Sequence, residues 1–157
     1  MKTFKDNAGR TWSVSVDVDA IRRVRTALKV NLTSTDFAAV LEQLLSDPVL
    51  LCDVLYVIVK PEADRQKVSD EDFGRSMAGD AIEHATAAFL EELANFTPNP
   101  RDRARVKRVL QAMWGLAEKT RDVADRNLES EIAKVMTSGP TSGGSPVSSG
   151  STPAGSP

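Results

Sequence analysis

"DPVLLCDVLYVIV", residues 47–59, decides the fold that the sequence predicts. Asp47 is a typical helix N-cap residue, and a proline follows it at the first helical position, where a helix needs no N–H donor. Residues 49–59 are apolar nearly all round, which is typical of a helix buried on every side. The length of this run also suits a buried strand, but the Asp-Pro start favours a helix. We therefore expect a buried central helix over residues 49–59.

The segments before this helix predict a hairpin and a first helix. Residues 2–4 and 11–16 flank "KDNAGR", whose Asn, Ala and Gly suit a short turn with one left-handed position. Residues 11–16 alternate apolar and polar side chains, as in a half-buried strand. The apolar spacing then becomes helical over residues 20–28, with Asp17 or Asp19 as the N-cap.

Two further helix starts are indicated by capping residues. Thr33 and Asp36 match a capping box, and Asn99-Pro100 precedes the last helix, which we expect to run to about Val135. That helix would be about 50 Å long, so we expect part of its apolar stripe to extend beyond the core of its own domain. The stripe consists of Val106, Leu110, Met113, Ala117, Val123, Ala124, Leu128, Ile132 and Val135.

Composition changes after residue 136. Residues 137–157 carry no charge and only Val147 as a sizeable apolar side chain, which predicts a disordered Gly/Pro/Ser/Thr-rich tail. Residues 1–136 are expected to form one mainly α domain, with an N-terminal β-hairpin packed on five to six helices and a long C-terminal helix. The predicted core is Trp12, Val24, Leu28, Phe37, Leu41, Leu44, Leu51, Leu55, Ile58, Phe73, Ile82, Phe89, Leu93 and Phe96.

"SDEDFGRSMAGD", residues 69–80, raises the question of a calcium loop. A loop of the EF-hand type that began at Asp70 would need glycine at its sixth position and glutamate at its twelfth. The sequence has Arg75 and Ala81 there. The calcium interpretation therefore fails on both positions.

The same acidic residues suit the start of a helix. Ser69 and Asp72 match a capping box, which places the acidic residues in the positive first turn of the helix dipole. Gly74 and Gly79 would then mark close packing and a break before a second helix capped by Asp80.

Little in the composition indicates catalysis. The chain has a net charge of −2 and one cysteine (Cys52), so it offers no internal disulfide framework and no cysteine-based zinc cluster. Its one histidine, His84, leaves little for metal or triad chemistry. Residues 1–10 are polar and charged, unlike a secretory signal, and no stretch approaches the roughly 18 apolar residues of a membrane span. We expect a cytosolic protein with no catalytic, cofactor-binding or metal-binding residues.

Two basic clusters, residues 22–25 and 101–108, allow an alternative function in nucleic-acid binding or regulation. Three arginines of the second cluster share a helical face, and Glu91 and Glu92 are available as partners. No sequence signature of a nucleic-acid-binding fold accompanies them. A solvated or partner-facing surface is therefore the preferred interpretation. The three arginines are Arg101, Arg105 and Arg108.

Two stretches, "DNAGRTWSVSVDVDAIRRVRTALKVNL" and "LYVIVKPEADRQKVSDEDFGRSMAGDAIEHATAAFLEELANFTP", together resemble small proteins of tailed phages and prophages of the tail assembly chaperone type. The resemblance covers about residues 5–98. It implies a non-enzymatic protein in the cytoplasm of a bacterial host, which binds the tape measure protein before the tail tube polymerises. In many phages a longer, frameshifted form of such chaperones also recruits tail tube subunits. The sequence does not distinguish a chaperone from a structural tail component.

A chaperone for an aggregation-prone helical partner needs exposed apolar surface. The end of the last helix is expected to supply it through Leu128, Ile132 and Val135, because a partner helix could lie along such a stripe. Burial of the same stripe in a homo-oligomer is the equal alternative. Charges of both signs surround the stripe, namely Arg121, Arg126, Glu129, Glu131 and Lys134.

Overall fold

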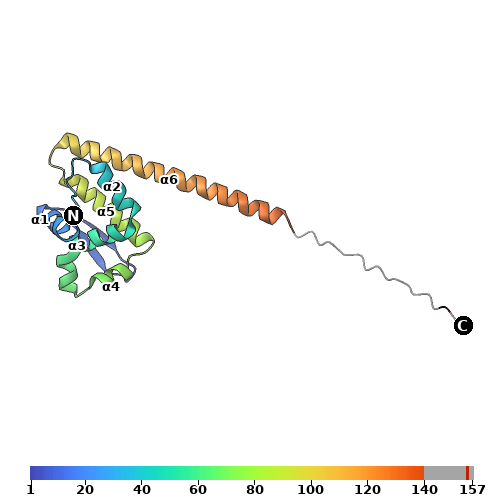
Figure 1. Cartoon of the computed structure of the whole chain (residues 1–157), viewed down its shortest axis with the longest axis horizontal. Helices are drawn as coiled ribbons and strands as arrows, with labels where there is room; N and C mark the ends of the chain where they lie inside the picture. The colour runs from blue at the N-terminus through green and yellow to red at the C-terminus, as the bar shows by residue number, and fades with distance from the viewer. Residues whose placement is uncertain (140–154, 156–157) are drawn as a thin grey trace. The chain divides into compact units, whose positions relative to one another are not determined.

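The computed structural model describes residues 1–139 and residue 155, apart from the side chains of Met113 and Ala117. This part of the chain is mainly helical, with an N-terminal two-stranded hairpin and a long C-terminal helix, so the predicted fold class is confirmed. The predicted tail, residues 137–157, lies outside the described residues except for 137–139 and 155. The elements are β1 (Lys2–Lys5), β2 (Thr11–Val14), α1 (Val18–Leu28), α2 (Phe37–Ser46), α3 (Pro48–Gln66), α4 (Asp70–Arg75), α5 (Asp80–Phe96) and α6 (Pro100–Thr137) (Figure 1).

The chain divides into two compact units, Met1–Met113 and Trp114–Pro157, with the boundary inside α6. The first unit contains the hairpin, α1 to α5 and the N-terminal turns of α6. In the second unit, the described secondary structure is the remainder of α6.

The hairpin is anchored by two aromatic side chains. β1 and β2 pair antiparallel with Phe4 opposite Trp12, and both side chains are buried. Gly9 in the turn has φ +80°, the left-handed conformation that glycine adopts without steric cost. The strands contact α5 and α3, so the apolar face of the hairpin forms part of the core.

α3 is the central element of the first unit and contacts β2, α1, α2, α4 and α5. As predicted, the Asp47 carboxylate caps it by accepting hydrogen bonds from two backbone N–H groups in the first turn, at 3.1 and 3.0 Å. Val49 departs from the expectation because it is 70% exposed in that first turn. The helix also continues past residue 59 to Gln66, since Ala63 extends its buried face. The buried residues are Leu51, Val54, Leu55, Ile58, Val59 and Ala63.

α3 runs through Pro61, which lacks the N–H that the Val57 carbonyl would accept in a regular helix. Arg23 of α1 supplies donors at this point. Its Nε donates to the Val57 carbonyl at 3.3 Å, and its Nη2 donates to the Ile58 carbonyl at 3.2 Å. Arg23 also forms an ion pair with Asp19. The guanidinium therefore replaces the missing donor and ties α1 to α3.

Removing this guanidinium by Arg23→Ala is expected to lower the free energy of unfolding by about 1–2 kcal/mol, because the Val57 carbonyl loses its donor. Pro61→Ala restores a backbone N–H, so Arg23→Ala should be less destabilising in that background, with a coupling of about 0.5–1 kcal/mol. Urea unfolding of the two single variants and the double variant measures this coupling. The exposed neighbour Arg22 serves as the control, since Arg22→Ala should change stability by less than about 0.5 kcal/mol. An equal effect of Arg23→Ala in both backgrounds would contradict the assignment.

The predicted capping box of α2 is wrong in its first member. The N-cap is Asp36, whose carboxylate accepts the backbone N–H of Ala39 at 3.2 Å. The Thr33 hydroxyl instead accepts a hydrogen bond from Arg25 at 3.0 Å. Asp36 is adjacent to the first helical residue, so its short side chain reaches the first turn without help from Thr33.

The start of α5 also differs from the prediction. Asp80 is the first helical residue, and the N-cap is Gly79, with φ 54° and ψ −126°. Side chains rarely tolerate this backbone conformation, which explains glycine at this position. Close packing is not the reason for either glycine, because a Cβ on Gly74 or Gly79 would have no neighbour within 4 Å.

Ten of the fourteen predicted core residues are buried, and the other four, Leu28, Phe37, Ile82 and Phe96, are half-buried. These four lie near helix ends or on the flank of a buried face, where periodicity alone does not separate half-burial from burial. Buried side chains that were not in the predicted core include Phe4, Val14, Leu32, Val54, Val59 and Leu90.

Candidate functional site

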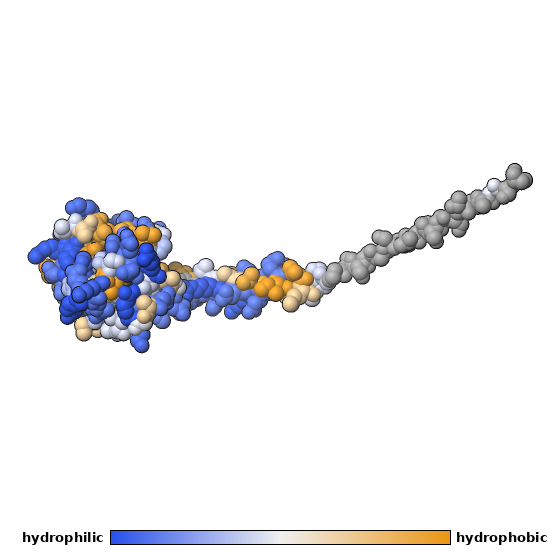
Figure 2. Space-filling model, turned by 90° about the horizontal axis from the view of Figure 1, so that it is seen from below, coloured by the Kyte–Doolittle hydropathy of each residue, from blue (hydrophilic) through white to orange (hydrophobic). Residues whose placement is uncertain are grey.

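The aliphatic stripe at the end of α6 consists of Leu128, Ile132 and Val135. Their exposed fractions are 60%, 50% and 72%, so each side chain offers apolar surface to solvent. Figure 2 shows this hydrophobic surface on the last described turns of the helix. Spacings of four and three residues place the three side chains on one helical face. The structure therefore gives the three predicted residues a shared, exposed face. Whether a partner binds there remains a prediction.

The upstream part of the predicted apolar stripe is not uniform. Leu110, in the first unit, is buried at 4% exposure. Val123, in the second unit, is 55% exposed, and it is nine residues, or two and a half turns, from Ile132. Val123 therefore lies on the face opposite Ile132, and it does not belong to the aliphatic stripe.

The acidic segment 69–80 forms a helix start, as predicted. Ser69 Oγ accepts the backbone N–H of Asp72 at 3.1 Å, and three acidic residues occupy the first turn of α4. Within the described residues, no group of three or more His, Cys, Asp or Glu side chains is placed to hold a metal ion.

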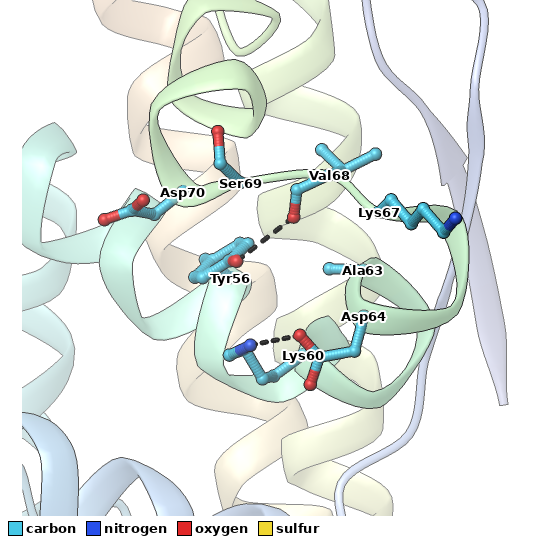
Figure 3. A pocket seen from close by; sticks show the side chains of 8 residues that line it. All are labelled: Tyr56, Lys60, Ala63, Asp64, Lys67, Val68, Ser69 and Asp70. Carbon is cyan, nitrogen blue, oxygen red and sulfur yellow. Dashed lines mark hydrogen bonds and ion pairs between the residues drawn. The ribbon is translucent and has the colours of Figure 1, made fainter.

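An open depression of about 510 Å³ lies beside α4 and the second half of α3 (Figure 3). Three of its polar side chains have partners within it. Tyr56 Oη donates to the Val68 carbonyl at 3.2 Å, and Lys60 is ion-paired with Asp64. The hydrogen bond to Asp64 raises the pKa of Lys60, which keeps the amine charged. A charged amine has no free lone pair, so Lys60 is not a nucleophile in this arrangement.

A second depression of about 330 Å³ lies against α1 and includes Arg22 and Arg25 of the first basic cluster. Arg25 Nη2 donates to Asn31 Oδ1 at 2.7 Å and to Thr33 Oγ1 at 3.0 Å. With Arg23 bound to α3, two of the three arginines of this cluster therefore hold the fold together.

The second basic cluster is more accessible. Arg101, Arg105 and Arg108 are exposed. The expected partners Glu91 and Glu92 bind elsewhere: Glu91 forms an ion pair with Lys2 at 2.6 Å, and Glu92 with the N-terminal amine at 2.9 Å. The hairpin brings the N-terminus onto α5, and this long-range contact takes both acids.

The single cysteine and the single histidine lie in different surroundings. Cys52 is half-buried in α3, and burial raises the pKa of its thiol, with a further contribution from the Asp53 carboxylate. A raised pKa disfavours the reactive thiolate. His84 is exposed on α5.

The sequence did not point to Asp6, which is the most extensively bonded buried polar residue described here. Its side chain is fully buried, and its Oδ2 accepts hydrogen bonds from both Trp12 Nε1 at 2.9 Å and Arg10 Nε at 2.8 Å. Backbone N–H groups of Ala8 and Arg10 also donate to it, at 3.0 and 2.9 Å. The bond to residue i+2 is an Asx turn, so Asp at the first position of "DNAG" was the available signal.

Acid pH should weaken this network. Burial alone would raise the pKa of the Asp6 carboxyl, but hydrogen bonds from Trp12 and Arg10 and the Arg10 charge outweigh burial and lower the pKa. A lowered folded-state pKa gives stability that is present above the unfolded value of about 3.9 and is lost as pH falls through the folded value.

We therefore expect the free energy of unfolding of Asp6→Asn to approach that of the wild type as pH falls below about 4. The variant lacks the titrating group, so it is less stable at pH 7 but has less to lose in acid. Urea unfolding of both proteins between pH 7 and pH 2.5 measures the difference, and the comparison cancels the contribution of the other carboxylates. A difference that stays constant with pH would contradict the prediction.

Comparisons with protein-family models, with curated proteins and with solved structures find no match to this chain. Among the described helices, none combines the length and the apolar character needed to cross a bilayer.

Proposed function

We propose that this chain is a non-enzymatic protein of the tail assembly chaperone type, which binds the tape measure protein during phage tail morphogenesis in the bacterial cytoplasm. The observation that supports the proposal is the exposed aliphatic stripe of α6. A long helical client needs a binding surface of this kind, because helix-in-groove recognition uses apolar anchors at steps of three and four residues. The resemblance of residues 5–98 to such chaperones supplies the identity of the client.

The size of the stripe predicts weak affinity when the stripe acts alone. Fully burying an aliphatic side chain contributes roughly 1.5–3 kcal/mol, and association costs at least about 4 kcal/mol. Three side chains that are 50–72% exposed can gain only part of that amount. The stripe alone therefore suits reversible binding, as a chaperone requires when its client is handed to the assembling tail.

Co-expression with the tape measure protein tests this function. A tagged chain should retain an untagged tape measure protein through affinity purification and size exclusion, and should increase the soluble fraction of that protein. A tail tube subunit, co-expressed in the same way, tests the second proposed client. If the tape measure protein is neither retained nor solubilised, the proposal is wrong.

The alternative is a nucleic-acid-binding or regulatory role, and one observation favours it: Arg101, Arg105 and Arg108 are exposed on one face of α6. Such binding would weaken steeply with salt, since each neutralised phosphate releases counterions. Electrophoretic shifts of duplex DNA between about 50 and 200 mM salt decide the question. Loss of binding in an Arg105→Glu/Arg108→Glu variant would support this alternative over the chaperone.

A further inference from the structure

The aliphatic stripe of α6 has two unlike flanks. Four carboxylates follow one another along one side at steps of four, three and four residues. We call this set, Glu118, Asp122, Asp125 and Glu129, the acidic row; all four residues are exposed. Among the described residues, none of the four has an ion-pair partner within 4.0 Å.

The acidic row runs beside the stripe rather than across it. Asp125 is three residues before Leu128, and Glu129 is three residues before Ile132, so each carboxylate is a surface neighbour of an aliphatic side chain. From Glu118 to Glu129 the row advances eleven residues in three turns, a period close to that of a straight α-helix, so it stays parallel to the axis of the stripe.

The other flank is close to neutral. It carries Thr120 and Asn127, followed by Glu131 and Lys134, which form an ion pair at 3.2 Å. Arg121 lies on the aliphatic face itself, about two turns before Leu128, and marks the N-terminal limit of the stripe. Beside the stripe itself, Asp125 and Glu129 make one flank more negative than the other by about two charges, and Glu118 and Asp122 continue the acidic row toward the N-terminus.

Neighbouring carboxylates in the acidic row are like charges at i,i+3 and i,i+4, which destabilises an isolated helix. Lys119 and Arg126, which lie beyond the row, and Arg121, which is three residues after Glu118 and four before Asp125, offset part of this repulsion. A partner that places cations against the row would remove the remainder, so the free helix favours a basic neighbour.

A second copy of this chain is a poor partner for this face. Two such helices packed antiparallel across the stripe would place acidic row against acidic row, because antiparallel packing brings identical flanks together. Parallel packing would set the acidic row against the neutral flank, where Lys134 is the single cation and already pairs with Glu131. Neither arrangement buries the stripe and also neutralises the row.

We propose that α6 docks an amphipathic helix whose aliphatic stripe is flanked by lysine or arginine on the side that meets the acidic row. The inference rests on the proposed function, from which it takes a helical protein segment as the partner. The new claim is that this segment is basic. A tape measure segment that binds here carries Lys or Arg beside its Leu, Ile or Val anchors.

Two labelled synthetic helical peptides of about 25 residues test the charge requirement. They share one leucine stripe and differ only in carrying Lys or Glu along its flank. By fluorescence anisotropy with the full chain, the lysine peptide should bind about tenfold more tightly at low salt, and the difference should shrink at high salt. A scrambled peptide with the same lysine content but no stripe should bind weakly.

The matched variants are Asp125→Lys/Glu129→Lys, which reverses the acidic row beside the stripe, and Glu42→Lys/Asp53→Lys, which changes net charge equally at exposed positions of the first unit. The first variant should reverse the peptide preference, and the second should keep it. Equal binding of both peptides, equal binding of the scrambled peptide, or reversal by the control variant would overturn the inference. So would sedimentation of the wild type as a dimer that Leu128→Ser dissociates.

This outcome is separable from that of the proposed function. If the tape measure protein binds regardless of charge reversal, the chaperone role stands and the basic-partner inference is wrong. If the lysine peptide shows the expected preference while the tape measure protein is not retained, the inference stands and the client must be another basic helical protein.

Discussion

Asp6→Ala is expected to lower the free energy of unfolding by about 3 kcal/mol and the Tm by about 10 °C. The substitution removes a fully buried carboxylate and leaves Trp12 Nε1 without its acceptor. It also releases Arg10, whose Nη2 donates to Ser76 Oγ at 2.6 Å and to the Asp72 carbonyl at 3.3 Å. The loss therefore extends from the hairpin turn to the end of α4.

The effect on this network can be followed by fluorescence. Trp12 packs edge-on against Phe73 with ring centroids 5.3 Å apart, so its emission should shift when the hairpin loosens. A Trp114→Phe background leaves Trp12 as the single tryptophan, because the chain has two. Urea unfolding in that background compares Asp6→Ala with Asp53→Ala, an exposed control expected to change stability by less than about 0.5 kcal/mol. Equal unfolding midpoints for the two variants would contradict the role given to Asp6.

Local signals predicted most of the fold. Asp47-Pro48 and Asn99-Pro100 start helices where expected, and Ser69 starts α4. Each signal acts within one turn of the residue that carries it, so it can be read from neighbouring letters of the sequence. Local signals also misplaced the N-cap of α2. Thr33 and Asp36 can both cap a helix, and the capping-box pattern did not show that Asp36 is the N-cap.

Long-range contacts could not be predicted in this way. Arg23 reaches carbonyl groups 34 and 35 residues away, and Glu62 accepts the backbone N–H of Ser13 at 2.9 Å, 49 residues away. Such pairs depend on how the elements pack, and nothing in the local pattern identifies the partner. A basic cluster at residues 22–25 therefore suggested a nucleic-acid surface, although two of its arginines are bonded within the fold.

The candidate site was predictable only in part, because helical spacing is a local property and exposure is not. Helical period placed Leu128, Ile132 and Val135 on one face. It could not show that these side chains are at least half exposed, because exposure depends on what the rest of the chain covers. The acidic row required no tertiary information, since its spacing is a local property of the helix. It becomes meaningful only beside an exposed stripe.

Leu128→Ser/Ile132→Ser is expected to weaken binding of the partner helix by roughly thirty- to a hundredfold while leaving the fold intact. The two side chains are 60% and 50% exposed in the free chain, so covering them gains about half of full burial, together roughly 2–3 kcal/mol. Isothermal titration with the co-purified tape measure protein, or with the lysine peptide, measures the loss.

The matched control is Leu116→Ser/Val123→Ser, which removes two aliphatic side chains of the same helix that are 65% and 55% exposed. They are seven residues apart and share a face, but Val123 lies two and a half turns from Ile132, on the opposite side. Each variant replaces one leucine and one β-branched residue with serine, so the helix-propensity penalty is similar in both, and any such effect on α6 appears in both variants. Binding should therefore fall only when the aliphatic stripe is changed.

If both variants weaken binding equally, α6 acts through its stability rather than through the face that carries the aliphatic stripe. If Leu128→Ser/Ile132→Ser instead unfolds the first unit, the stripe belongs to the core of the protein.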